Sequence, residues 1–217
     1  MSIDYTRTRE TMVEQQVRPW GVLDVRVLSV LAKMPRHAFV AESLRHLAYA
    51  DTELPIGRGE TMLKPVLEGR ALQSLQLQPE ESVLEIGTGS GYLTACLAQL
   101  AREVVSIERH ADLAEAAQAR IAAQGCANVT VRCTDAFEWN PGRSFDVIFV
   151  GAAAAEVPER FVEWLNPGGR MFIVHGQSPV MEAVLVHRAV NGTRIDSLFE
   201  TDLVYLAGAQ PAPAFTL

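Results

Sequence analysis

Three glycines at alternate positions, Gly87, Gly89 and Gly91, are the residues whose type and spacing first suggest chemistry. They follow the apolar run 82–86 and precede the segment 92–101, whose apolar residues have helical spacing. A glycine in such a turn adopts a positive φ angle and lets a ligand lie against the backbone. The dinucleotide pattern Gly-x-Gly-x-x-Gly would need its third glycine at the position of Tyr92, so the pyrophosphate fingerprint is not met.

Two acidic residues follow at the expected ends of the next two strands. Glu108 closes the run 103–108, about 20 residues after Gly87, where nucleotide-binding α/β folds place an acid that accepts both ribose hydroxyls. Asp135 follows the run 128–133, and its carboxylate could accept a hydrogen bond from an adenine amino group. Because open α/β sheets bind ligands at the carboxyl ends of their strands, the glycines and the two acids together predict an adenosine-containing ligand.

Each of these features has an ordinary structural explanation when it is taken alone. Glycine triplets occur in turns, Glu108 could be a solvated acid at the start of a helix, and Asp135 could cap one. The shared order and spacing favour a cofactor site. The residues expected to bind the cofactor are Glu85, Gly87, Thr88, Gly89, Ser90, Gly91, Glu108, Arg109, Asp135 and Ala136.

Alternating strand-like and helix-like segments from Ser82 onward must position these residues. Strands are predicted over residues 82–86, 103–108, 128–133, 145–152 and 171–176. Helices are predicted over residues 92–101, 111–125 and 158–165, and a turn over 166–170. Strands separated by helices form parallel βαβ units that are covered on both faces. The sequence therefore predicts an α/β fold with a doubly wound (Rossmann-like), mostly parallel sheet.

Two flanks lie outside this alternation. Residues 24–40 and 64–78 are helical in period, and the turn-rich segment 49–65 joins them. After Gly176, antiparallel strands are predicted over residues 181–190, 193–200 and 203–208, followed by a loose tail over 209–217. We therefore expect a helical extension with a substrate loop over residues 1–78, packed on a core domain over residues 79–217.

Composition and charge narrow the classes of partner. The chain of 217 residues has a formal net charge of -7, which argues against nucleic acid as the main partner. No apolar stretch has the roughly 20 residues that cross a bilayer, and the first residues lack the apolar core of a secretion signal, so no membrane partner is expected. The spacings of Cys96, Cys126 and Cys133 suit reduced thiols in a cytoplasm, and the histidines form no short-spaced pair that predicts a metal site.

The glycine loop and the two strand-end acids, in this order, resemble S-adenosylmethionine-dependent methyltransferases. Longer blocks over residues 12–40, 49–65, 83–100 and 145–176 resemble successive parts of the protein-L-isoaspartate O-methyltransferase family. The resemblance implies a class I methyltransferase fold with S-adenosyl-L-methionine as its cofactor. It also implies methylation of the free carboxylate of L-isoaspartyl residues in damaged proteins or peptides, which starts repair through a succinimide. We expect a monomer or a weak homodimer.

The implied reaction needs little acid–base help from the protein. A carboxylate oxygen attacks the sulfonium methyl group in line, and a carboxylate is already ionised at neutral pH. Catalysis would then rest on orientation and partial desolvation of the acceptor. A chain without a convincing catalytic dyad fits this chemistry.

The substrate loop departs from the family pattern. The family typically reads Thr-Ile-Ser-x-Pro, with the serine hydroxyl near the acceptor carboxylate, whereas this chain reads Thr61-Met62-Leu63-Lys64-Pro65. Leu63 cannot donate a hydrogen bond, and losing a donor to a charged acceptor costs roughly 1.5–3 kcal/mol, or about one to two powers of ten in rate. Thr61, Leu63 and Lys64 are therefore the candidate acceptor-loop residues, although Lys64 could be a solvated loop residue and Thr61 a turn former.

Two alternatives remain open on the sequence. A related methyltransferase could act on a different, less polar acceptor, which the side chain of Leu63 would suit, or the protein could bind the cofactor without turning it over. A second departure is Ala155, where the family usually has proline. Arg18 matches an arginine common in the family, and we interpret it as a structural ion-pair partner. We interpret Trp20 as a core residue, and residues 55–57 as shaping the acceptor loop.

Overall fold

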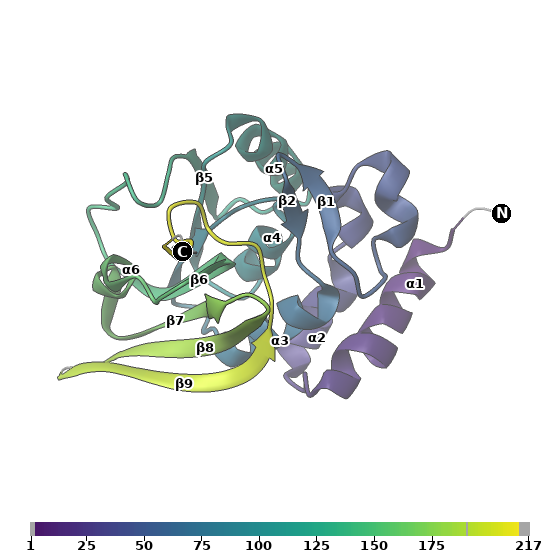
Figure 1. Ribbon diagram of the computed structural model, residues 1–217. Helices are drawn as coiled ribbons and strands as arrows, with labels where there is room; N and C mark the ends of the chain where they lie inside the picture. The colour runs from purple at the N-terminus through teal and green to yellow at the C-terminus, as the bar shows by residue number, and fades with distance from the viewer. Residues whose placement is uncertain (1–2, 190, 213–217) are drawn as a thin grey trace, which may run out of the picture.

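The computed structural model describes residues 3–189 and 191–212 of the chain. In these residues, seven strands form one sheet in the order β5-β4-β3-β6-β7-β8-β9 (Figure 1). The strands are β3 (Ser82–Ile86), β4 (Glu103–Glu108), β5 (Val129–Cys133), β6 (Phe145–Ala154), β7 (Leu165–Gln177), β8 (Val180–Ala189) and β9 (Gly192–Thr201). Neighbours from β5 to β7 pair parallel, whereas β8 and β9 pair antiparallel. The predicted α/β fold with a mostly parallel sheet is confirmed.

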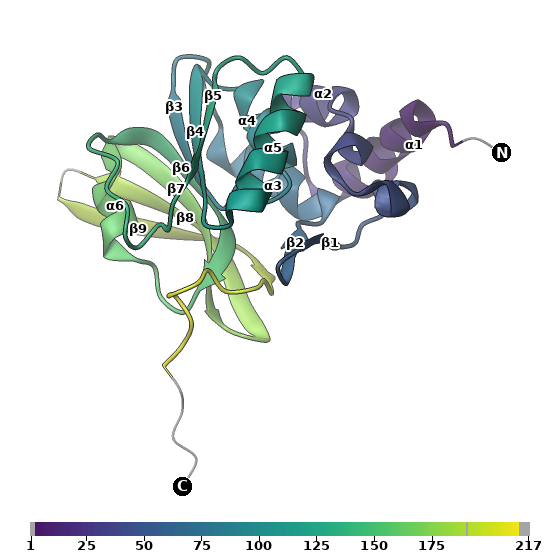
Figure 2. The ribbon, with the colours of Figure 1, turned by 90° about the horizontal axis from the view of Figure 1, so that it is seen from above.

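The central strands are buried on both faces, which explains their continuous apolar runs. Val83 and Phe149 belong to one apolar cluster, whereas the adjacent Leu84 and Val150 belong to a second cluster on the opposite face. Helices α3 (Pro65–Leu75), α4 (Tyr92–Ala98) and α5 (Ala111–Ala123) cover the first face, and the short α6 (Glu159–Glu163) lies on the second (Figure 2). The two faces are therefore covered unevenly.

The N-terminal segment packs against the helices that cover the first face of the sheet (Figure 2). It contains α1 (Tyr5–Met12), a π-helical turn (Val13–Val17), α2 (Val25–Lys33) and 3-10 turns at Arg18–Trp20, Arg36–Phe39 and Glu42–Leu47. The helix predicted over 24–40 ends at Lys33 because Pro35 disfavours a helical conformation at Met34, whose ψ angle is 120°. Apolar side chains of this segment belong to the same cluster as Val83.

Two interpretations of the N-terminal residues had different outcomes. Arg18 forms an ion pair with Glu14 at 2.9 Å, as expected. Trp20 is 60% exposed, so its interpretation as a core residue is wrong. The chain turns at Gly21, whose φ angle is +85°, and this turn leaves the indole on the surface at the end of the helical segment.

The turn-rich segment before α3 forms a β-hairpin. Strands β1 (Leu54–Gly57) and β2 (Glu60–Met62) pair antiparallel, with Arg58 at a φ angle of +58° between two glycines. Arg58 also forms an ion pair with Asp112 at the start of α5, at 3.0 Å. The hairpin is thereby held beside the carboxyl ends of the parallel strands.

Two predictions near the C-terminus are wrong. The turn predicted over 166–170 belongs to β7, whose pairing with β6 changes register there while Gly168 adopts a φ angle of +83°. The strand predicted over 203–208 forms only an isolated bridge between Tyr205 and Ala153, because the chain crosses the end of β6 instead of running along a sheet edge. Of the predicted tail, residues 213–217 lie outside the described residues. None of the described helices has the length and hydropathy that a membrane crossing requires.

Candidate active site

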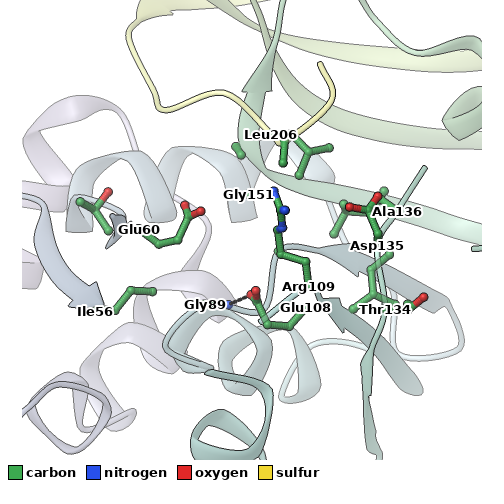
Figure 3. A pocket seen from close by; sticks show the side chains of 16 residues that line it. Ile56, Glu60, Gly89, Glu108, Arg109, Thr134, Asp135, Ala136, Gly151 and Leu206 are labelled. Carbon is green, nitrogen blue, oxygen red and sulfur yellow. Dashed lines mark hydrogen bonds between the residues drawn. The ribbon is translucent and has the colours of Figure 1, made fainter. Parts of the chain in front are cut away.

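The carboxyl ends of β3, β4, β5 and β6 border an open cleft (Figure 3). From the sheet, its lining comprises Ile86, Gly87 and Gly89, Ile107 to Arg109, Thr134 to Ala136, and Gly151 and Ala152. The hairpin adds Ile56, Glu60 and Thr61, and the C-terminal crossing adds Leu206 and Ala207. Figure 3 shows the hairpin residues and Asp135 on opposite sides of this cleft.

The glycine loop has the conformation that its sequence requires. Gly87, Gly89 and Gly91 have φ angles of +93°, +53° and +86°, which side chains rarely tolerate. The N–H groups of Gly87 and Thr88 donate to the carbonyl of Ile107 at 2.9 and 3.2 Å, which ties the loop to β4. A Cβ atom at position 89 would lie 3.2 Å from Cδ1 of Ile56 across the cleft. Glycine at 89 therefore keeps the space between the loop and the hairpin open.

Both strand-end acids are oriented by backbone N–H groups. Oε2 of Glu108 accepts from Gly89 at 3.0 Å, and Oε1 accepts from His110 at 3.0 Å. Oδ1 of Asp135 accepts from the N–H of Phe137 at 2.8 Å. A carboxylate oxygen has two lone pairs, so each of these oxygens can accept a further hydrogen bond from a ligand.

A second, inner cavity adjoins the cleft. Both spaces are lined by Thr61, Gly87, Gly89 and Gly151, which therefore mark the passage between them. The other residues that line the inner cavity are Met62, Leu63, Glu68, Glu85, Thr88, Ser90, Leu93 and Phe149. A ligand with a nucleoside half and a second polar half could extend from one space into the other.

Glu85 is the buried acid of β3 and faces the inner cavity. Its Oε2 accepts hydrogen bonds from the hydroxyl groups of Ser106, at 2.5 Å, and Thr94. Burial raises the pKa of Glu85 to about 8, against the effect of these two hydrogen bonds, and the nearby Glu108 and Glu68 raise it further. The hydrogen bonds to Glu85 therefore do not offset the cost of burying its charge at the wall of the inner cavity.

Most of the predicted cofactor residues lie together. Of the ten, all except Gly91 line the cleft or the inner cavity; Gly91 caps α4 and packs against Ala117 and Ile121 of α5. In the predicted acceptor loop, Thr61 lines both spaces and Leu63 lines the inner cavity with 9% of its surface exposed. Lys64 is exposed at the start of α3, outside the lining of either space.

Ile56, within the segment 55–57 that was expected to shape the acceptor loop, lines the cleft. Sequence reasoning missed several other residues that line these spaces: Glu60, Met62, Glu68, Ile86, Leu93, Ile107, Thr134, Phe149, Gly151, Ala152, Leu206 and Ala207. Gly151 and Ala152 could have been found, because they come late in a strand beside the glycine loop, where the same strand-end rule applies. Leu206 carries no such signal, since only the crossing over β6 brings it to the cleft. Within the described residues, no group of three or more His, Cys, Asp and Glu side chains could hold a metal ion.

A glycine loop and strand-end acids on an open, mostly parallel sheet define a class I S-adenosylmethionine-dependent methyltransferase. The family model of Protein-L-isoaspartate(D-aspartate) O-methyltransferase (PCMT) matches residues 7–208. The chain belongs to this family, as its sequence blocks predicted.

Relatives and solved structures agree with this assignment. The chain is 41% identical over 207 residues to protein-L-isoaspartate O-methyltransferase 1 of Rhodopseudomonas palustris (strain HaA2), covering 94% of this chain and 84% of the relative. It is 39% identical over 207 residues to the enzyme of the same name from Syntrophobacter fumaroxidans, covering 95% and 97%. A Plasmodium falciparum crystal structure described as a putative protein-L-isoaspartate O-methyltransferase in complex with S-adenosyl-L-homocysteine superposes with a TM-score of 0.80 at 25% identity, over 91% of this chain and 97% of that one.

Proposed function

We propose that this protein transfers a methyl group from S-adenosylmethionine to the free carboxylate of L-isoaspartyl residues in proteins and peptides. One observation carries the proposal: Thr61 of the substrate loop and Gly89 of the cofactor loop line the same passage between the cleft and the inner cavity. This arrangement places an acceptor held by the substrate loop beside a cofactor held by the glycine loop. The family assignment over residues 7–208 supports the choice of acceptor.

The residues of the cleft fit this cofactor. A side chain at Gly89 would fill the space before Ile56, so the bare backbone leaves room for a flat ligand. Two oriented carboxylates, Glu108 and Asp135, lie at neighbouring strand ends, where they would accept from the ribose hydroxyls and from the adenine amino group. When bound, S-adenosylmethionine supplies an electrophilic methyl group.

Apolar side chains also line the cleft. Ile56 of the hairpin and Leu206 of the C-terminal crossing present apolar surface to it from two sides (Figure 3). Glu85, Thr88 and Ser90 line the inner cavity, where they would bind the amino-acid half of the cofactor. Desolvation of the reacting groups strengthens every electrostatic interaction in such a site.

The substrate loop is fixed from beneath by Arg36, whose Nη2 donates to the carbonyl of Leu63. Because an acceptor carboxylate is already ionised at neutral pH, the loop needs to orient it and does not need to supply a base. Thr61 is the hydroxyl-bearing residue of this loop that lines the passage. We assign Thr61 to acceptor positioning, with Leu63 forming an apolar wall.

The apolar wall of Leu63 supports a second candidate, a methyltransferase of the same fold with a less polar acceptor. One assay separates the candidates: incubation of the protein and labelled cofactor with an isoaspartyl peptide and with its aspartyl counterpart. We expect base-labile methyl ester on the isoaspartyl peptide alone. Cofactor binding without methylation of either peptide would overturn the isoaspartyl acceptor, and transfer to other components of a cell extract would then favour the second candidate.

We further propose a cytoplasmic location, supported by the free cysteines Cys96, Cys126 and Cys133. The monomer or weak homodimer stays a prediction. Sedimentation at several protein concentrations would check it.

A further inference from the structure

Two buried carboxylates from different elements border the inner cavity. Glu68 of α3 is 2% exposed and Glu85 of β3 is 1% exposed, and both line the inner cavity beyond the glycine loop. Neither the binding of the nucleoside nor the orientation of the acceptor uses Glu68. A buried acid retained at a cavity wall is costly unless a partner offsets its desolvation.

Of these two acids, only Glu68 pairs with a cation in the described residues. Oε2 of Glu68 accepts from Nη1 of Arg36, a residue that is itself fully buried. Glu85 accepts only from hydroxyl groups and forms no ion pair within the described residues. In that same part of the structure, Oε1 of Glu68 and Oε1 of Glu85 accept no hydrogen bond. Arg36 therefore offsets the charge of Glu68 alone, and each of the two carboxyl groups has one oxygen that could accept a further hydrogen bond.

Among the described residues that affect the pKa of Glu68, Arg36 is the one cation. The titratable and charged groups around it are Arg36, Asp51, Glu85, Tyr92 and Cys96. Burial raises the pKa of Glu68 to about 8, although Arg36 acts in the opposite direction, and the nearby Asp51 adds to the rise. A second cation that donates hydrogen bonds into the cavity would favour the ionised form of both acids.

We propose that Glu68, together with Glu85, binds the ammonium group on the amino-acid half of the cofactor. The inference rests on the proposed function, because adenosine in the cleft directs the other half of the molecule past Gly87 and Gly89 into the inner cavity. An ammonium group offers three donors and a positive charge, which is what the two spare oxygens lack. An acceptor carboxylate would be repelled by both acids, so the charges select the cofactor and not the acceptor.

Isothermal titration calorimetry with two ligands tests this assignment. S-Adenosylhomocysteine carries the amino-acid half, whereas methylthioadenosine has the same nucleoside without it. Replacement Glu68→Gln should weaken the binding of S-adenosylhomocysteine by about 10- to 100-fold, as expected for loss of a charged hydrogen bond, and leave methylthioadenosine within about twofold. The matched control Glu108→Gln should weaken both ligands, since both contain the ribose.

A decarboxylated analogue of S-adenosylhomocysteine identifies the group that Glu68 contacts. This analogue keeps the amine, so Glu68→Gln should weaken it as strongly as the parent ligand. Equal effects of the replacement on methylthioadenosine and S-adenosylhomocysteine, or no effect on either, would overturn the inference. A wild-type protein that binds none of the three ligands would instead overturn the proposed function.

A second variant guards against a folding failure. Glu68→Gln leaves Arg36 with a weaker partner, whereas the double replacement Arg36→Leu with Glu68→Leu substitutes apolar groups for the whole buried ion pair, a change that proteins often tolerate. The double variant should show the same selective loss for ligands that carry the amine. Equal losses of S-adenosylhomocysteine and methylthioadenosine in the double variant would likewise overturn the inference.

Discussion

Glu108 accepts a hydrogen bond of 3.0 Å from the backbone N–H of Gly89, so the acid at the end of β4 and the glycine loop after β3 form one unit. The other oxygen of Glu108 is held by the N–H of His110 at 3.0 Å. The carboxylate is therefore oriented by the backbone, and little side-chain entropy remains to be lost on binding. This arrangement makes Glu108 the most direct test of the cofactor site.

Replacing Glu108 with Ala should raise the dissociation constant of S-adenosylhomocysteine by about 10- to 100-fold, because the ribose hydroxyls lose a charged acceptor. Calorimetry provides the measurement. Glu103→Ala at the opposite end of β4, where the acid pairs with Arg102 and Arg143, is the matched control and should leave the constant unchanged. Equal constants for Glu108→Ala and the wild type would remove Glu108 from the site.

Gly89→Leu should abolish measurable cofactor binding, since the new side chain would enter the space before Ile56. The φ angle of +53° also adds strain of roughly 1–2 kcal/mol. Gly142→Leu is the control, because Gly142 has a φ angle of +67° and a Cβ atom there would meet no other atom within 4 Å, so the strain arises without obstruction. Binding by calorimetry and stability by urea unfolding separate the two effects. Similar binding losses in both variants would contradict the assignment of Gly89 to the cofactor site.

Leu63→Ser should raise kcat/KM for an isoaspartyl peptide by about 10- to 100-fold, if a hydroxyl at the inner cavity can donate to the acceptor. The change also removes packing, because Leu63 belongs to the apolar cluster that contains Val83. It should lower the free energy of unfolding by about 1–3 kcal/mol. Leu63→Ala removes the same packing without adding a donor. Initial rates with the three proteins check the prediction, and an equal gain in the alanine variant would refute the donor argument.

The stability of the protein without added ligand should fall as pH rises from about 5 to 8. The unfolded chain ionises Glu85 near its ordinary pKa of 4.5, whereas burial raises the pKa in the folded protein to about 8. Between these values the folded state binds the extra proton, so raising the pH favours unfolding by up to about 1.4 kcal/mol per pH unit for this group.

The replacement Glu85→Gln should flatten that pH dependence. Glutamine keeps an acceptor for the hydroxyls of Ser106 and Thr94 and does not ionise. Urea unfolding of both proteins at pH values of about 5.5, 6.5 and 7.5, which lie between the two pKa values, provides the comparison. Glu68 contributes to the residual slope, since burial raises its pKa as well. Parallel curves for the two proteins would show that Glu85 is ionised in the folded state.

The sequence predicted the parts of the molecule that depend on local pattern. Strand β3 and the turn at Gly87 follow from apolar runs and from the conformational freedom of glycine, and the position of Glu108 follows from the strand-end rule. The hairpin residue Glu60 and the crossing residue Leu206 were missed, because long-range contacts bring both to the cleft. Trp20 was misread for a related reason: hydrophobic character alone does not show which aromatic residues the fold covers.

The crossing of the C-terminal segment over β6 affects the order in which the protein is completed during synthesis. A nascent chain that has emerged only as far as β6 carries the glycine loop and both strand-end acids, but Leu206 and Ala207 are still to be made. Leu206 and Ala207 are therefore added to the cleft after its other lining residues have been made. Retention of the nucleoside by stalled chains of increasing length should accordingly increase once the stretch around Tyr205 has left the ribosome and bridged to Ala153.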